Sequence, residues 1–97
     1  MLILIAETDK TVSGMNKEIL EMKGHQVTEA HSIEKATKYI KTFSFDIIIV
    51  CMTLPHDNHT VNEGEGFKII KKLSPVSGIL ITTGLNDYDL ITALTRC

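Results

Sequence analysis

The sequence predicts an α/β protein with a doubly wound parallel sheet that is covered by helices on both faces. Two observations lead to this fold class. Short continuous apolar runs alternate with segments in which apolar residues recur at helical spacing. The resulting order, β-α-β-α-β-α-β-α, places the strands in a parallel sheet between two helical layers. The 97 residues are enough for one domain, over residues 1–97, and too few for two.

Four segments are expected to be strands. Residues 2–6, 46–52 and 78–83 are apolar and rich in β-branched side chains, which is typical of buried strands. Residues 26–30 form a shorter run with alternating polarity, which favours an edge strand.

The first helix is expected between the first two strands. Thr8 or Asp9 can cap its start, and Gly24 is placed to end it. Its apolar residues recur at helical spacing and predict the buried face, which consists of Val12, Met15, Ile19 and Met22.

Three further helices follow the later strands. Ser32 is a good N-cap for the second helix, and the third is expected to stop before Ser74 because Pro75 disfavours helical geometry in the preceding residue. A fourth is expected to start near Asn86 or Asp87. The predicted apolar faces are Ile33, Ala36, Ile40 and Phe43, then Phe67, Ile70 and Leu73, then Leu90, Ile91 and Leu94.

Composition and charge make several classes of protein poor candidates. Ten basic and twelve acidic residues give a net charge of −2, and the best basic cluster, Lys68, Lys71 and Lys72, is typical of a solvated helix face, so we expect no nucleic-acid partner. The apolar start is too short for a signal peptide or membrane span, which predicts a cytoplasmic protein without a membrane partner. Cys51 and Cys97 do not match the pattern of a disulfide framework, so reduced thiols are expected.

Three segments carry a resemblance to a known family. Residues 3–9 end in an acidic cluster, residues 46–55 form a buried strand that ends in Leu54 and Pro55, and residues 79–84 end in Thr83 and a glycine. Together they resemble the response-regulator receiver domain, which has the flavodoxin-like, CheY-like three-layer fold. The resemblance covers nearly the whole chain. It implies two-component or phosphorelay signalling, and a histidine kinase or an effector domain as partner.

The departures from the family pattern concern the phosphorylation site. In the family, an acidic cluster after the first strand holds Mg²⁺, an aspartate of the third strand accepts the phosphoryl group, and a lysine of a fifth strand steadies it. By this resemblance Cys51 stands at the acceptor position, Thr8 replaces an acidic residue beside Glu7 and Asp9, and the fifth βα unit is missing. Thr83 matches the switch position. Glu7 is then a remnant of the Mg²⁺ site, and we expect no cofactor.

These features predict a receiver-like protein-interaction module that works without phosphorylation and is not an enzyme. Two alternatives remain open. Asp9 or Asp57 could restore a phosphorelay carboxylate, or Cys51 could act as a thiol sensor or metal ligand. His56, Asp57, His59, Glu63 and Glu65 lie in one long loop, for which a solvated segment is favoured over a metal site, and His25 and His31 are predicted to be surface residues.

No G-x-x-x-x-G-K-[ST] or G-x-G-x-x-G motif is present, which weakens the case for an independent enzyme. Without a fifth strand, residues 78–83 would form an uncovered sheet edge, and such an edge predicts a homodimer or exchanged-element assembly.

Overall fold

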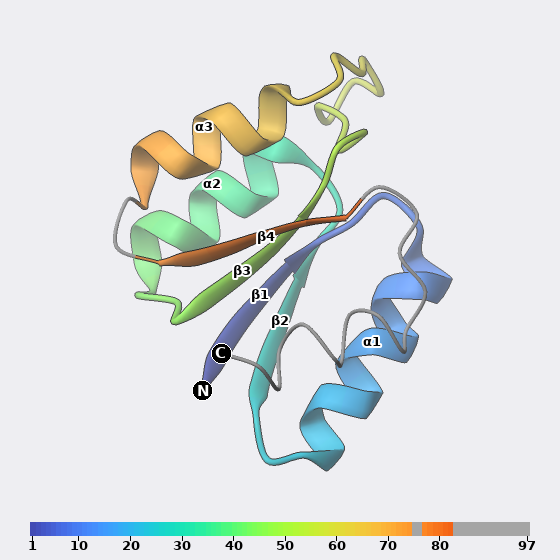
Figure 1. Ribbon diagram of the computed structural model, residues 1–97. Coiled ribbons are helices and arrows are strands. Elements are labelled where there is room, and N and C mark those ends of the chain that lie inside the picture. Colours follow the sequence, from blue (N-terminus) through green and yellow to red (C-terminus); the bar gives the residue numbers. More distant parts are fainter. Residues whose placement is uncertain (75–76, 83–97) are drawn as a thin grey trace.

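A four-stranded parallel sheet organises the fold, with strand order β2-β1-β3-β4 (Figure 1). This computed structural model describes residues 1–74 and 77–82. The expected fourth helix, Thr83 and Cys97 lie outside these residues. The strands are β1 (Leu2–Ala6), β2 (Gln26–Ala30), β3 (Ile47–Cys51) and β4 (Gly78–Thr82), and the helices are α1 (Lys10–Met22), α2 (Ile33–Thr42) and α3 (Glu65–Leu73).

Strand β1 pairs with β2 on one side and with β3 on the other. Ala6, the last residue of β1, lies opposite both Ala30 and Val50. The first and third strands are therefore neighbours, as the sequence argument required. Strand order reverses around β1, so the carboxyl ends of β1 and β3 form the switch point at which ligands bind in sheets of this type.

The two faces of the sheet are covered by different helices. Helix α1 lies on one face, and α2 and α3 lie on the other (Figure 1). Because successive strand side chains point to opposite faces, each central strand contributes to both layers of the core. The α1 side holds Ile3, Ile5, Leu20, Val27, Ile47 and Ile49. The α2 and α3 side holds Leu4, Ala6, Ala30, Ile33, Ala36, Phe45, Ile48, Val50, Leu54 and Ile70.

The helix boundaries follow local capping chemistry. The Asp9 carboxylate accepts hydrogen bonds from the backbone N–H of Thr11 and Val12, and the Ser32 hydroxyl accepts one from Lys35 N–H at 3.2 Å. Gly24 follows the end of α1 with φ of 92°, a left-handed conformation that glycine adopts at low cost. The predicted caps at Asp9 and Ser32 are thus confirmed.

The predicted buried face of α1 is wrong. Met15 is 49% exposed and Met22 is 81% exposed, while Val12 and Ile19 are only partly buried. The helix instead buries Ser13, Asn16 and Leu20.

A polar contact explains why α1 turns a different face toward the sheet than the one predicted. The Ser13 hydroxyl donates a 2.6 Å hydrogen bond to the Glu29 carboxylate on β2, and Lys17 approaches the same carboxylate at 3.9 Å. These bonds satisfy polar groups on the face that meets the sheet, where hydrophobic periodicity predicts apolar residues.

Close packing also sets the position of α3. A Cβ atom added to Gly66 would lie 3.2 Å from Leu54 Cδ2, so a larger residue would press against the core. Helix α3 ends at Leu73, before Ser74, as predicted, although Leu73 itself is 40% exposed. Within the described residues, no helix has the length and apolar character needed to cross a membrane.

The α1 face can be tested by two substitutions in the same helix. Leu20→Ala removes a fully buried side chain and should lower the free energy of unfolding by about 2 to 5 kcal/mol. Met15→Ala removes a half-exposed side chain and should change it by less than about 1 kcal/mol. Urea denaturation of both variants gives the comparison. A larger loss for Met15→Ala than for Leu20→Ala would contradict the orientation described.

Candidate functional site

Cys51 is the last residue of β3 and lies at the switch point beside the end of β1. It is 6% exposed. Glu7 and Thr8 directly follow β1, so the strand pairing brings these two residues and Cys51 to the same edge of the sheet. The expected convergence of Glu7, Thr8 and Cys51 at the strand ends agrees with this arrangement.

Two hydroxyl groups surround the Cys51 sulfur. Sγ lies 3.2 Å from Thr53 Oγ1 and 3.6 Å from Thr8 Oγ1. The Thr8 hydroxyl donates its proton to the Thr53 carbonyl oxygen at 3.1 Å, which leaves its lone pairs free to accept from the thiol. The Thr53 hydroxyl can in turn donate to Sγ. Both hydrogen-bonding roles of a thiol are thereby satisfied.

The two carboxylates of the expected acidic cluster are engaged with backbone groups. Asp9 Oδ1 accepts from Thr11 N at 2.8 Å and from Val12 N at 3.2 Å, which makes it the cap of α1. Glu7 Oε1 accepts from Asp9 N at 3.3 Å. In the described part of the chain, the hydrogen-bonding side chains around Cys51 Sγ are therefore two threonines, with no carboxylate among them.

The remaining candidates lie elsewhere. Asp57 is exposed in the loop between β3 and α3, where its backbone N–H donates to Glu34 Oε1 at 2.8 Å. Thr83 falls outside the described residues. Over residues 1–74 and 77–82, no three His, Cys, Asp or Glu side chains are grouped so that they could hold a metal ion.

His56 forms the best-defined polar contact in the loop of residues 55–65. Its Nδ1 lies 2.8 Å from Glu34 Oε2 at the start of α2, and its Nε2 lies 2.7 Å from Glu65 Oε1 at the start of α3. A solvated segment was predicted for this loop, and residues 57–63 are exposed, whereas His56 is partly buried. We call the contacts of His56 with Glu34 and Glu65 the histidine clamp.

The clamp changes the titration of all three groups. Hydrogen bonds to Glu34 and then Glu65 raise the pKa of His56, because an imidazolium can donate from both ring nitrogens. The hydrogen bond with His56 lowers the pKa of Glu34. The pKa of Glu65 is lowered first by the hydrogen bond from the Asn62 amide at 2.6 Å and then by His56.

His31 is less exposed than the sequence predicted, and it makes a contact that was not expected. It was predicted to be a surface residue, yet its ring is only about one-third exposed, and its Nδ1 lies 3.0 Å from the Glu7 carbonyl oxygen. The clamp partner Glu34 and the Cys51 neighbour Thr53 were missed, and Glu65 was named only as a member of the loop. The available signal was position: each follows a strand end or starts a helix at the carboxyl edge of the sheet.

Comparison with known proteins identifies the same architecture. The family model for the response regulator receiver domain matches residues 3–97. No curated protein sequence matches the chain.

Solved structures with this fold come from several bacteria. A response regulator protein from Burkholderia pseudomallei, solved with a phosphorylated aspartic acid, a calcium ion and citrate, is 26% identical with a TM-score of 0.71. The match covers 88% of this chain and 48% of that one, so the chain spans about half of that protein's length. A two-component response regulator from Clostridium difficile is 27% identical, with a TM-score of 0.74. The match covers 98% of this chain and 75% of that one.

The chemotaxis response regulator CheY4 of Vibrio cholerae has a TM-score of 0.81. Coverage is 98% of this chain and 96% of that one, and identity is 18%, so this likeness concerns the fold alone.

The histidine clamp predicts a specific pH profile of stability. The raised His56 pKa contributes stability that is complete below the ordinary histidine value, about 6.5, and is lost as the pH rises through the raised value. The lowered Glu34 and Glu65 pKa values contribute stability above the ordinary carboxyl range, which is lost as the pH falls through the lowered values. The clamp should therefore stabilise the fold most near about pH 5.5.

His56→Asn tests this profile by urea denaturation across a pH series. The loss of stability relative to the unmodified protein should be largest near about pH 5.5 and should shrink toward pH 8. His59→Asn is the matched control, since His59 is exposed and Asn tolerates its φ of 70°. A loss for His56→Asn that stays constant over this range would show that the clamp carries no titrating contact.

Proposed function

The chain belongs to the response regulator receiver family, and we propose that it is a receiver that works as a protein-interaction module without being phosphorylated. Receiver domains are signalling modules that interact with histidine kinases or effector domains. What is proposed for this chain is that partner binding, and not phosphoryl transfer, carries its signal.

The surroundings of Cys51 are the observation that carries this proposal. Phosphoryl transfer to a receiver needs a carboxylate nucleophile and a metal ion that neutralises the developing charge. Mg²⁺ prefers oxygen ligands, above all carboxylates, and holds them in a near-octahedral arrangement. A thiol between two threonine hydroxyls supplies neither a hard anionic ligand for Mg²⁺ nor a carboxylate that could accept the phosphoryl group.

Replacement of the missing carboxylate by Asp9 is poorly supported. Both backbone bonds at the start of α1 depend on Asp9 Oδ1, and turning this side chain toward Cys51 would break the N-cap. Loss of an N-cap costs about 1 kcal/mol. Asp57 is tethered through its backbone to Glu34 and would need a rearrangement of the loop.

A thiol-sensor role for Cys51 is also less well supported. The side chain is 6% exposed and sits in a strand end where its hydrogen bonds are satisfied. Reactive cysteines are partly exposed and lie in electropositive surroundings.

The comparison with the Burkholderia protein sharpens the proposal. That structure contains a phosphorylated aspartic acid and a calcium ion. By the family pattern, the equivalent position on the third strand is Cys51 here. We infer that the two proteins share the receiver architecture and differ in this chemical step.

The outer edge of β4 in the described sheet supports a second proposal. Within the described residues β4 has β3 on one side and no strand on the other. Unpaired backbone groups at a strand edge favour pairing with another chain. We infer that two copies of the chain associate through β4.

Phosphodonor labelling tests the main proposal. Incubation with acetyl phosphate and Mg²⁺ should add no phosphoryl group to the intact protein, because no carboxylate stands at the Cys51 position. The Asp9→Asn and Asp57→Asn variants should behave identically, and Asn preserves the N-cap at position 9. Incorporation of one acid-stable, base-labile phosphoryl group would refute the proposal, and its loss in one variant would identify the acceptor.

Association through β4 predicts a dimer by light scattering at high protein concentration. Amide hydrogen exchange provides an internal control, because β2 forms the opposite edge of the described sheet. Protection of β4 amides should increase with concentration, while that of β2 amides stays constant. A monomer at all concentrations would contradict association.

A further inference from the structure

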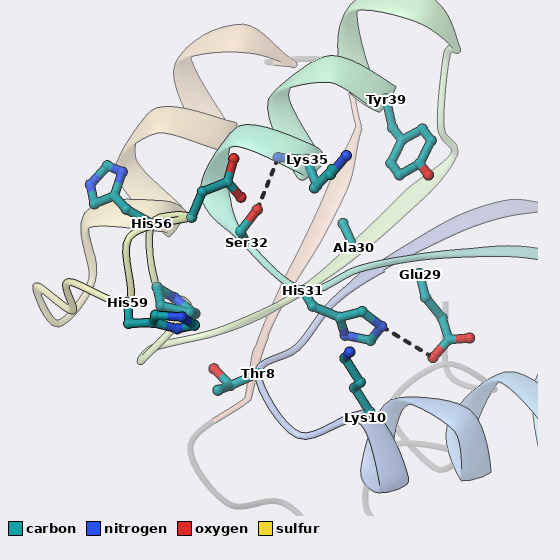
Figure 2. Close-up of a pocket in the computed structure, with 12 residues that line it drawn as sticks. Thr8, Lys10, Glu29, Ala30, His31, Ser32, Lys35, Tyr39, His56 and His59 are labelled. Carbon is teal, nitrogen blue, oxygen red and sulfur yellow. Dashed lines mark hydrogen bonds and ion pairs between the residues drawn. The ribbon is translucent and has the colours of Figure 1, made fainter.

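The two carboxylates of the histidine clamp belong to different helices. Glu34 lies in the first turn of α2, Glu65 begins α3, and His56 lies beside both helix starts (Figure 2). Its Nδ1 is 2.8 Å from Glu34 Oε2, and its Nε2 is 2.7 Å from Glu65 Oε1. An imidazole ring donates from both nitrogens only when it is protonated. The geometry of the clamp is therefore that of an imidazolium.

A neutral His56 ring cannot keep both contacts. It has one N–H group, and the lone pair of its other nitrogen would then face a carboxylate oxygen at hydrogen-bond distance. Both carboxylates are ionised when the ring loses its proton, because the clamp lowers the pKa of Glu34 and of Glu65. Two acceptors in contact repel each other, so one side of the clamp must open.

The contact with Glu34 is the weaker of the two. The Glu34 side chain is 47% exposed and that of Glu65 is 31% exposed, so water replaces a lost partner of Glu34 at lower cost. Glu65 is also fixed from a second direction, because the Asn62 amide donates to its Oε2 at 2.6 Å. A neutral ring therefore keeps its proton on Nε2, toward Glu65, and loses Glu34.

The same two carboxylates tie the exposed residues 57–63 to the helices. Asp57 N–H donates to Glu34 Oε1 at 2.8 Å, and Asn62 bonds Glu65 through its side chain and through its carbonyl oxygen, which accepts from Glu65 N–H at 3.0 Å. Each carboxylate thus accepts one hydrogen bond from His56 and one from the exposed part of the loop. A change at His56 is passed directly to these tethers.

The two ends of the loop are anchored by bonds that do not depend on charge. The Pro55 carbonyl oxygen accepts from Ile33 N–H at 2.8 Å, and the Met52 carbonyl oxygen accepts from Gly64 N–H at 2.8 Å. These backbone bonds persist when the ring loses its proton. The response to His56 is therefore confined to residues 57–63.

Other charges near the clamp do not replace the ring proton. The titratable groups that face His56 or share its pocket are Glu34 and Lys35 of α2, Glu65 of α3, Asp57 and His59 of the loop, and Lys10, Glu29 and His31 across the pocket. One turn further along the two helices are the exposed Lys38 and Lys68. Over residues 1–74 and 77–82, no lysine ammonium lies within 4.0 Å of Glu34 or Glu65.

We propose that the histidine clamp is a pH-operated latch on residues 57–63. Protonated His56 holds this segment to both helices. Loss of the ring proton opens the contact with Glu34, releases Asp57 from the start of α2 and leaves the contact with Glu65 closed. The loop also forms part of the wall of a pocket of about 470 Å³ beside α2, so opening of the latch changes the shape of that pocket. The latch is independent of the proposed lack of phosphorylation.

Nitrogen-15 NMR of the whole chain, recorded from about pH 5 to about pH 9, tests the proposal. The His56 ring should titrate above the ordinary histidine value of about 6.5, and its neutral form should carry the proton on Nε2. The Asp57 amide proton should shift upfield with the same midpoint, because it loses a hydrogen bond to a carboxylate. An Asp57 amide that does not follow the His56 titration would overturn the proposal, as would a neutral ring protonated at Nδ1.

Glu34→Gln removes the dependence on the ring proton while it keeps the size of the side chain. The Gln amide can donate to a neutral Nδ1, and its oxygen can still accept from Asp57 N–H. The pH-dependent shift of the Asp57 amide should be lost, and the pKa of His56 should fall relative to the unmodified protein because one carboxylate is gone.

Glu63→Gln is the matched control, because Glu63 is an exposed carboxylate of the same loop and lies outside the clamp. It should leave the His56 titration and the Asp57 shift unchanged, and circular dichroism verifies that both variants are folded. An Asp57 shift that persists in Glu34→Gln, or that is lost equally in Glu63→Gln, would show that the clamp does not operate the loop.

Discussion

The pairing of β1 with both β2 and β3 is the interaction on which the rest of the structure depends. It aligns Ala6 with Ala30 and Val50, and so sets the level at which all three strands end. The polar residues that follow each strand then meet along one edge. Cys51 and the histidine clamp occupy that edge because the register places them there.

The chemistry of this edge is the basis for proposing that the chain does not accept a phosphoryl group. Hydroxyl groups surround Cys51, and the nearby Asp9 carboxylate stabilises the start of a helix. The Cys51 thiol and Asp9 Oδ1 already have hydrogen-bond partners within the protein, which weakens their tendency to bind a divalent cation. The same scaffold is therefore proposed to bind a partner where its family carries out phosphoryl chemistry.

The sequence predicted the features that depend on local pattern. The strands are continuous apolar runs, and Asp9 and Ser32 cap helices through bonds to residues two or three positions away. Long-range partners were not predictable in the same way. The buried face of α1 depends on Glu29 in β2, and the role of His56 depends on the meeting of two helix starts. Periodicity reports neither contact, because each is a polar bond between distant segments.

A magnesium titration monitored through the NMR chemical shifts of the backbone amides tests most directly the claim that this edge lacks the phosphorylation chemistry of a receiver. It asks whether the edge formed by Glu7, Thr8 and Cys51 holds the ion that receiver phosphorylation requires. We expect no saturable shift of these three amides at millimolar Mg²⁺. Saturable shifts confined to this edge would show a working cation site and would contradict the account.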